Sequence, residues 1–368
     1  MTPLLAATLD HLRELVLFDT RNPPRAIGTG GIFTYLRDQL TGFKCEIVDH
    51  GAGAVSLLAV RGSPTILFNV HLDTVPASPT WKRDPFQLTV ENDRAIGLGA
   101  CDIKGAAAGL IAASKQSSGG IAFLFTSDEE ANDARCIAAF LERGLKYDTV
   151  IVSEPTRCEA VLAHRGISSV FVKFAGQAGH ASSATSNSAV HQAMRWGTKA
   201  LSFAESLSHE RFGGLTGLRF NIGRIEGGIK ANVIAPTAEV RFGFRPLPSM
   251  DSNELLSEFR ACAENDVEEI VETFRGPSLP SGGVAIAESR RLTARDGADA
   301  MDIPIGNAVD FWTEASLFSA AGYTAFVYGP GDIAQAHAAD EFVALSQLQT
   351  AAGTYARIIG GASKHGRA

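Results

Sequence analysis

Cysteine is scarce in this chain, and its spacing excludes two kinds of stabilised fold. The 368 residues include five cysteines, an odd number, and none belongs to a C-x-x-C pair. A disulfide framework or a thiolate zinc site would need cysteines paired at short spacing. The scattered pattern is typical of reduced thiols, so it predicts a cytoplasmic protein.

Long apolar segments and an excess of basic residues are also absent. No stretch of about 18 apolar residues, the length that spans a bilayer, occurs in the sequence. Asp10, Arg13 and Glu14 interrupt the N-terminal segment where a signal peptide needs an apolar core. The formal net charge of -7 argues against nucleic acid and anionic membranes as partners. We therefore expect a small-molecule partner, no nucleic acid and no membrane.

The most informative feature of the sequence is a set of four short apolar runs in which polar residues do not alternate. They are Thr65–Val70, Ile121–Phe125, Thr149–Val152 and Thr324–Tyr328. Runs of this kind are typical of parallel strands that are covered on both faces. The sequence therefore predicts an α/β fold, with a mainly parallel sheet and helices on both of its faces.

Each of these runs leads into side chains that can bind a metal. The residues in question are His71 and Asp73, Glu129 and Glu130, Glu154, and His337. Because ligands of open parallel sheets bind beyond the carboxyl ends of the strands, these side chains should converge at one edge. Taken singly, a strand-end histidine, an acidic turn and a loop histidine also fit ordinary surface roles. Taken together, they predict a hydrolytic metal centre.

A glycine-rich segment, Gly97–Gly105, allows two interpretations. It precedes a helix of small residues, as a dinucleotide-binding loop would. However, Asp102 stands where such a loop has its third glycine, and a carboxylate there would repel a pyrophosphate. This favours Asp102 as a further metal ligand.

The spacing of the acidic and histidine residues suggests different tasks. His71 and Asp73 lie two residues apart at a strand end, so their side chains point to the same side. A carboxylate that orients a ligand histidine is the usual arrangement around a metal. Glu129 and Glu130 are adjacent and project differently, so one can bind metal while the other acts as a base. The set of nitrogen and oxygen donors fits two zinc ions about 3.5–4 Å apart.

The middle of the chain has a different pattern and predicts an inserted α+β unit. Its expected elements are strands at Val170–Phe174, Leu218–Ile222 and Ala238–Phe244 and amphipathic helices at Ala189–Leu207 and Asn253–Thr273. We expect this unit at residues 166–278, splitting a catalytic domain formed by residues 1–165 and 279–368.

The segments Arg245–Pro248 and Gly329–His337 look most like the acetylornithine deacetylases of the M20 metallopeptidase family. Four motifs together resemble the family as a whole. They are His71–Pro76, Gly97–Gly105 with Asp102, Asp128–Glu130 and Ser153–Thr156, in the family's order. The resemblance spans nearly the whole chain. It implies a di-zinc hydrolase domain carrying a lid and dimerisation domain, with cobalt as an alternative metal.

The resemblance also implies a role for each residue of the metal site. Asp102 would bridge both metals, His71 and Glu154 would hold one, and Glu130 and His337 would hold the other. Asp73 would orient His71, and Glu129 would be the general base that later protonates the leaving amine.

Further roles follow for the lid and for one glycine. His180 would reach the partner subunit's site in a homodimer and stabilise the oxyanion. Asn232 and Arg245 would grip the substrate carboxylate, and Gly329 would line the substrate site. One departure is Leu98, where many relatives carry arginine. It leaves Asp102 intact but weakens any inference about substrate from distant members.

The activity implied is hydrolysis of an amide that releases acetate from an N-α-acetyl amino acid in arginine biosynthesis. The first expected substrate is N-acetyl-L-citrulline and the second is N-acetyl-L-ornithine. The alternatives are a di-zinc dipeptidase or another acyl-amino acid hydrolase, and a metal-free binding protein. An ornithine ammonium should need a carboxylate in its pocket, for which Asp310 and Glu314 are candidates.

Overall fold

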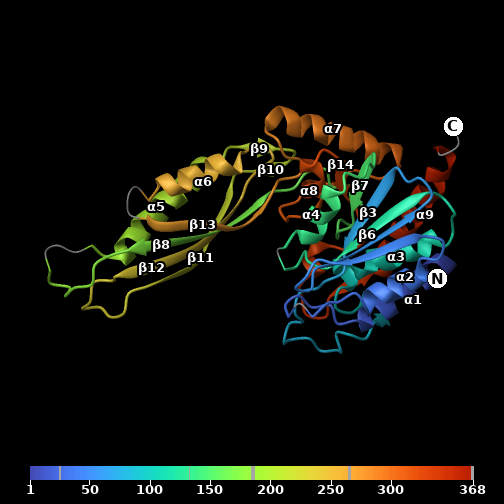
Figure 1. Cartoon of the computed structure of the whole chain (residues 1–368), viewed down its shortest axis with the longest axis horizontal. Helices are drawn as coiled ribbons and strands as arrows, with labels where there is room; N and C mark the ends of the chain where they lie inside the picture. The colour runs from blue at the N-terminus through green and yellow to red at the C-terminus, as the bar shows by residue number, and fades with distance from the viewer. Residues whose placement is uncertain (25, 132, 184–186, 264–266, 366–368) are drawn as a thin grey trace. The chain divides into compact units, whose positions relative to one another are not determined.

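The computed structural model describes residues 1–24, 26–131, 133–183, 187–263 and 267–365 (Figure 1). Contacts within the chain divide it into two compact units. Unit 1 consists of Met1–Leu162, Leu292–Gly306 and Thr313–Ala368, and unit 2 consists of Ala163–Arg291 and Asn307–Trp312.

Unit 1 is a mixture of helices and strands in which all of the predicted metal ligands lie. Its elements are α1 (Pro3–Leu17), α2 (Ile32–Gln39), β1 (Lys44–Asp49), β2 (Val55–Arg61), β3 (Ile66–His71), β4 (Thr89–Glu91), β5 (Arg94–Ile96), the short helical turn η1 (Ala100–Lys104), α3 (Gly105–Ser114), β6 (Ile121–Thr126), α4 (Arg135–Glu142), β7 (Thr149–Val152), α8 (Ala315–Ala320), β14 (Thr324–Val327), η2 (Ile333–Gln335), β15 (Phe342–Ala344) and α9 (Leu345–His365). Helix α7 (Val284–Ala300) is divided between the two units.

A six-stranded sheet forms the centre of unit 1, in the order β1-β2-β6-β3-β7-β14. The pairings of β6 with β3, of β3 with β7 and of β7 with β14 are parallel, whereas β1 and β2 pair in the antiparallel sense. The four parallel strands are the four apolar runs of the sequence. The predicted fold class, a mainly parallel sheet in an α/β domain, is therefore confirmed.

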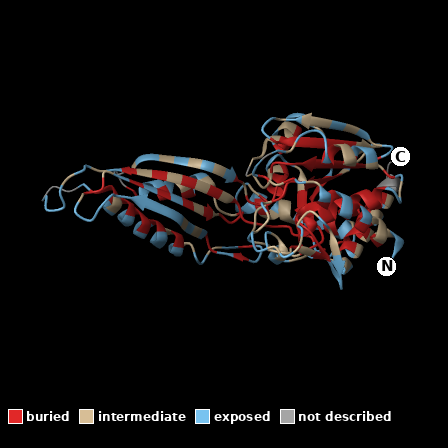
Figure 2. Cartoon of the chain, turned by 90° about the horizontal axis from the view of Figure 1, so that it is seen from below, coloured by how far each residue is buried: buried red, intermediate tan, exposed pale blue. Residues whose placement is uncertain are grey.

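Burial explains why these strands lack alternation. Every residue of β6 and β7 is buried, because side chains on both faces of the sheet are covered. Figure 2 shows these central strands as continuous red, whereas strands of unit 2 are striped by alternating burial. A strand covered on both sides gains stability from apolar residues at every position.

Helices cover both faces of this sheet (Figure 1). On one face, α3 lies against α1 and α9, and all ten residues of α3 are buried. The two helices approach closely at Gly109, where a Cβ would lie in ordinary van der Waals contact with Tyr355 of α9, at 3.4 Å. On the other face, Phe140 of α4 contacts Phe318 of α8. None of the described helices combines the length and apolar content needed to cross a membrane.

A small antiparallel sheet, in the order β15-β5-β4, includes β5, which directly precedes the loop that carries Asp102. Ile96 of β5 pairs with Phe342 of β15. The chain leaving β5 therefore runs beside the segment that enters β15. That segment contains His337, so two predicted ligands far apart in sequence lie on segments joined to neighbouring strands, Asp102 after β5 and His337 before β15.

Unit 2 is an α+β unit whose main sheet has four strands in the order β11-β12-β8-β13. Its elements are β8 (Ile167–Ala175), α5 (Ala189–Ser206), β9 (Arg211–Phe212), β10 (Leu215–Thr216), β11 (Arg219–Gly227), β12 (Thr237–Arg245), α6 (Ser252–Ala261) and β13 (Val267–Gly276). Alternate residues of β8 and β12 are buried, as in a sheet covered by helices on one face. Trp196 of α5 packs on Phe242 of β12 in this core.

One predicted element of unit 2 is wrong. The expected helix at Asn253–Thr273 ends much earlier, since α6 stops at Ala261 and Val267–Gly276 forms the edge strand β13. The second half of the expected helix contains Val267, Ile270 and Val271, which are β-branched and favour strands. Pairing with β8 decides the outcome, because Ile270 lies opposite Val172.

A buried histidine joins the first two helices of unit 1. The Nδ1 atom of His11 in α1 lies 2.7 Å from the hydroxyl oxygen of Tyr35 in α2. Burial lowers the pKa of His11 from 6.5 to about 4, and the positive charge of Lys115 acts in the same direction. The neutral imidazole is therefore the form that the fold accepts.

We expect the stability of unit 1 to fall as the pH drops from 6.5 toward 4. In that window the unfolded chain protonates His11 while the folded chain does not, so protons favour the unfolded state. The shift corresponds to at most about 3 kcal/mol. Urea unfolding of the metal-free protein at several pH values measures it. His11→Gln should flatten this part of the profile, and an unchanged profile in that variant would contradict the assignment.

Candidate metal centre

The predicted ligands come from the carboxyl ends of the central strands and from two loops beside them. His71 is the last residue of β3. Glu130 follows β6 by four residues, and Glu154 follows β7 by two. Asp102 lies in η1, and His337 follows η2. The parallel order of β6, β3 and β7 brings these ends together at one edge of the sheet.

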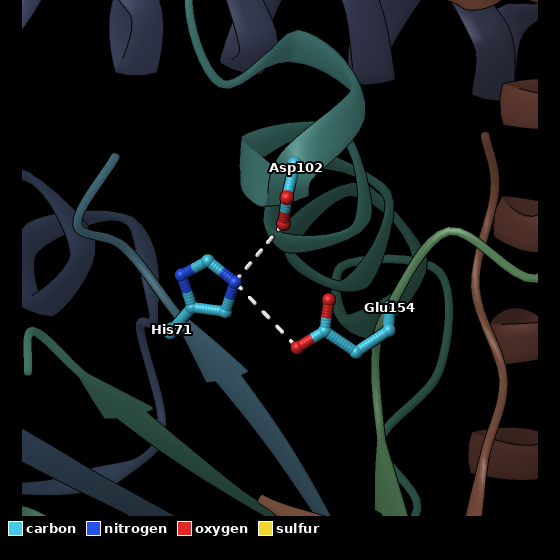
Figure 3. A group of neighbouring side chains, drawn as sticks. All are labelled: His71, Asp102 and Glu154. Atoms are coloured by element: carbon cyan, nitrogen blue, oxygen red, sulfur yellow. Dashed lines mark hydrogen bonds and ion pairs between the residues drawn. The ribbon is translucent and has the colours of Figure 1, made fainter. Parts of the chain in front are cut away.

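The first cluster contains His71, Asp102 and Glu154, all buried (Figure 3). The Nε2 atom of His71 lies 3.1 Å from Oδ1 of Asp102 and 3.5 Å from Oε1 of Glu154. The three side chains point toward one another from β3, from η1 and from the chain after β7. One nitrogen and two carboxylate oxygens thus surround a common point.

The second cluster contains Glu130, His337 and again Asp102. The Nε2 atom of His337 lies 2.9 Å from Oε1 of Glu130 and 3.3 Å from Oδ2 of Asp102. The two oxygens of Asp102 therefore face different histidines. A carboxylate shared in this way can bridge two cations.

The orientation of His71 is set by its other ring nitrogen. Nδ1 of His71 lies 3.0 Å from the backbone oxygen of Asp73, which only accepts hydrogen bonds. Nδ1 must therefore carry a hydrogen, so Nε2 would be the nitrogen that offers its lone pair to a bound cation. The nearest carboxylate oxygen of Asp73 is farther from Nδ1, at 3.6 Å. The backbone of Asp73 thus orients the ring more directly than its side chain does.

The other carboxylate oxygen of Asp73 holds a neighbouring segment. This oxygen, Oδ2, accepts hydrogen bonds from Nδ2 of Asn22 and from the backbone N–H of Glu130, both at 3.0 Å. This carboxylate therefore fixes the turn after β6 relative to the end of β3. Sequence reasoning did not identify Asn22, which becomes recognisable only when the two segments are seen together.

The charge of the site favours bound cations. Burial raises the pKa of Glu154 to about 7, and hydrogen bonds to Asp102 and Glu130 raise the pKa of His337 to about 11. Both shifts show that negative charge here is desolvated and that positive charge is favoured. Buried carboxylates are stable when they are paired or bind a metal. The nitrogen and oxygen donors fit divalent zinc, and cobalt or manganese also tolerate such a set.

Glu129 lies beside these clusters. Burial raises the pKa of Glu129, the charge of His71 lowers it, and the charges of Glu130 and Glu154 raise it. A carboxylate with a raised pKa can take up and return a proton near neutral pH. This property suits a general base, which is the role predicted for Glu129.

The two acids considered for an ornithine pocket occupy different surroundings. Glu314 is buried in unit 1, where its carboxylate accepts a hydrogen bond from the hydroxyl of Thr126 at 3.3 Å. Asp310 belongs to unit 2, where its Oδ1 atom lies 2.5 Å from Nε of the buried Arg165. Nε of Arg219 lies 3.8 Å from the same oxygen. The charge of Asp310 is therefore already balanced by guanidinium groups.

The structure also places the other predicted residues. Gly329 is buried against the ligand loop after β7, and a Cβ on it would lie 2.6 Å from the backbone oxygen of Glu154. In unit 2, the segments of His180 and Asn232 are hydrogen-bonded, since Ala181 N–H donates to the Asn232 oxygen at 3.1 Å. Arg245 ends β12, whose first residue, Thr237, follows Asn232 by five positions.

Arg245 is therefore far from His180 and Asn232 within one chain. The nine residues of β12 separate them, and a strand of that length spans about 26 Å at about 3.3 Å per residue. Arg245 instead lies beside Arg219 on β11, and both line a pocket of about 230 Å³. The structure does not bring Asn232 and Arg245 of a single chain to one carboxylate.

Comparison with known proteins agrees with this geometry. Residues 67–360 match Peptidase family M20/M25/M40. The chain is 69% identical over 364 residues to N-acetyl-L-citrulline deacetylase of Xanthomonas campestris pv. campestris, covering 98% of this chain and all of that protein. It is 30% identical over 331 residues to acetylornithine deacetylase of Proteus mirabilis, covering 84% and 83% of the two chains.

A solved structure gives the same result for the fold. The Bacillus subtilis YXEP protein, described as a dinuclear metal-binding peptidase from the M20 family, superimposes with a TM-score of 0.66. The match covers 98% of this chain and 99% of that one at 14% identity, so it concerns the fold alone. With a family match over most of its length and a nearly full-length relative at high identity, the chain belongs to the M20/M25/M40 peptidase family.

Proposed function

We propose that this protein is a metal-dependent amide hydrolase that releases acetate from N-acetyl-L-citrulline. The observation that carries the proposal is the pair of clusters that share Asp102, found in a chain 69% identical to an N-acetyl-L-citrulline deacetylase. N-acetyl-L-ornithine is the second candidate, because the more distant relatives are acetylornithine deacetylases. Either activity would belong to arginine biosynthesis.

Two divalent metal ions, zinc or cobalt, are the proposed cofactors. His71 and Glu154 would hold one ion, Glu130 and His337 would hold the other, and Asp102 would bridge them. The proposed location is the cytoplasm, where the free thiols of all five cysteines would persist.

The bound metal ions and Glu129 would have separate tasks in the reaction. Bound metal ions would polarise the acetyl carbonyl and activate the attacking water. Glu129 would take a proton from that water and deliver it to the amine nitrogen as the carbon–nitrogen bond breaks. The buried surroundings that raise the pKa of Glu129 would let it hold the proton between these steps. Acetate and the free amino acid would then leave.

The preference for citrulline is supported by charge. Citrulline ends in a neutral ureido group and ornithine in an ammonium, which needs a carboxylate that is not already balanced. Of the two acids considered, Asp310 is paired with Arg165 and approached by Arg219. Glu314 is buried in unit 1. Neither is an exposed, unbalanced carboxylate, which favours a neutral side chain in the substrate.

We propose that a homodimer forms through unit 2, which would act as the lid. Asn232 and Arg245 of one chain are too far apart to grip one carboxylate, so His180 and Asn232 would serve the partner subunit's site. Strand β11 is an edge of its sheet, and such an edge can pair with another copy. Helix α5, which contacts β11, also exposes Met194 and Leu201.

Substrate specificity is tested by kinetics on three substrates. We expect kcat/KM to be highest for N-acetyl-L-citrulline, lower for N-acetyl-L-ornithine and lowest for a dipeptide. Treatment with a chelator should abolish turnover, and added zinc or cobalt should restore it. A higher kcat/KM for the dipeptide would contradict the proposal and would indicate a dipeptidase. Full activity after verified metal removal would refute a metal-dependent mechanism.

Glu129→Gln tests the general base. The amide keeps the size of the side chain but cannot accept the proton, so kcat should fall by about 10²–10⁴-fold, the usual contribution of such a group. Metal content, measured by elemental analysis, should stay at the wild-type value because Glu129 is not assigned as a ligand. A variant with near-normal kcat would remove Glu129 from this role.

Ile225→Lys tests the dimer. Ile225 is about half exposed (54%) on β11, so a lysine there should oppose pairing at this edge and shift the protein toward a monomer. Light scattering after size-exclusion chromatography measures the mass. Val271→Lys is the matched control, because Val271 is exposed on the opposite edge strand, β13. A monomeric wild type, or an Ile225→Lys protein that stays dimeric, would contradict the proposed interface.

A further inference from the structure

Glu341 is a buried acid that neither cluster uses as a ligand. Only 2% of its surface is exposed. It follows His337 by four residues and precedes β15 directly. Its carboxylate is directed at the backbone of the loop that carries Asp102.

Among the described residues, the hydrogen bonds to this carboxylate come from backbone N–H groups. Oε1 of Glu341 accepts hydrogen bonds from the N–H groups of Cys101 and Asp102, both at 2.9 Å. Oε2 accepts from the N–H of Gly99 at 3.0 Å. The backbone oxygen of Glu341 accepts a further bond from Gly97 N–H, also at 3.0 Å. One residue therefore fixes four N–H groups of the segment Gly97–Asp102.

The held segment leaves little room for another conformation. Gly99 has a positive φ of 77°, and a Cβ on it would lie 2.7 Å from Cγ2 of Thr74. A Cβ on Gly105 would lie 2.4 Å from the backbone oxygen of Ala100. The loop therefore passes through a tight space, and the Glu341 carboxylate fixes its N–H groups there.

The position of the Asp102 backbone affects both clusters, because Asp102 belongs to each of them. Asp102 must direct one oxygen at His71 and the other at His337. Both the position and the orientation of its backbone therefore have to be fixed. Glu341 binds that backbone directly and belongs to the same segment as His337. The bridging ligand and the exposed histidine ligand are thus tied together by one side chain.

We propose that Glu341 is a positioning residue of the metal centre. Its carboxylate holds the backbone of Gly99–Asp102 so that Asp102 can bridge two metal ions. A carboxylate suits this task because both oxygens accept hydrogen bonds, whereas the amide of glutamine has one oxygen and an NH₂ group that only donates. The inference rests on the proposed metal centre and is independent of the substrate.

Glu341→Gln tests the proposal. In this variant the NH₂ group would face at least one of the three loop N–H groups, so the loop should shift and Asp102 should lose its alignment. We expect zinc and cobalt to bind about 10–100-fold more weakly, the usual effect of losing a residue that supports a ligand. Isothermal titration of the metal-free protein measures the affinity, and visible absorption of the cobalt form reports the coordination geometry.

Asp340→Asn is the matched control. It removes one negative charge from the adjacent position, but Asp340 contacts only the N–H of Lys82 and the guanidinium of Arg83 in the described contacts. Its backbone has a positive φ, which asparagine also tolerates. We expect wild-type metal affinity and a wild-type cobalt spectrum from this variant.

A second variant and a folding measurement separate the outcomes. Glu341→Asp keeps the charge but is one methylene shorter, so it should weaken metal binding in the same direction. Circular dichroism of each metal-free variant shows whether it folds. If both variants fold and bind metals like the wild type, or if they lose only thermal stability, the positioning role is wrong. A wild-type protein that binds no metal would instead refute the proposed function.

Discussion

The shared carboxylate of Asp102 is the feature on which the arrangement of unit 1 depends. Its two oxygens face His71 and His337, which come from segments far apart in sequence. Such a geometry requires the ends of β3, β6 and β7 and the loop before α3 to meet at one edge. The parallel sheet provides this meeting point, since parallel strands present their carboxyl ends on the same side. Desolvated acids at that edge then create a strong preference for cations.

The sequence predicts the part of this arrangement that follows from burial and strand direction. The four runs beginning at Thr65, Ile121, Thr149 and Thr324 form the parallel strands because full burial removes polar alternation. The convergence of His71 and Glu154 follows from the same rule, whereas Asp102 reaches the site from η1, outside the parallel sheet. The ligand roles themselves stay predictions, because the structure shows clusters that could bind metals.

Other features depend on contacts that a linear pattern does not contain. Glu341 and Asn22 act on backbone or carboxylate groups of segments brought near by the tertiary fold, so neither has a spacing signal. The helix expected to extend to Thr273 fails for a related reason. Its apolar spacing fits a helix, but pairing with β8 stabilises Val267–Gly276 as a strand. Long-range pairing overrides local preference at this position.

The wide spacing of the clustered residues has a consequence for the life of the protein in the cell. His71 lies in the first fifth of the chain and His337 in the last tenth. A nascent chain on the ribosome cannot form the second cluster until His337 has been synthesised, 266 residues after His71. A C-terminally truncated product that lacks His337 and Glu341 would likewise have an incomplete centre. Uptake of the full complement of metal would thus report that synthesis had passed His337 and that the early and late segments had folded together, and chains that stop before His337 would lack the second cluster.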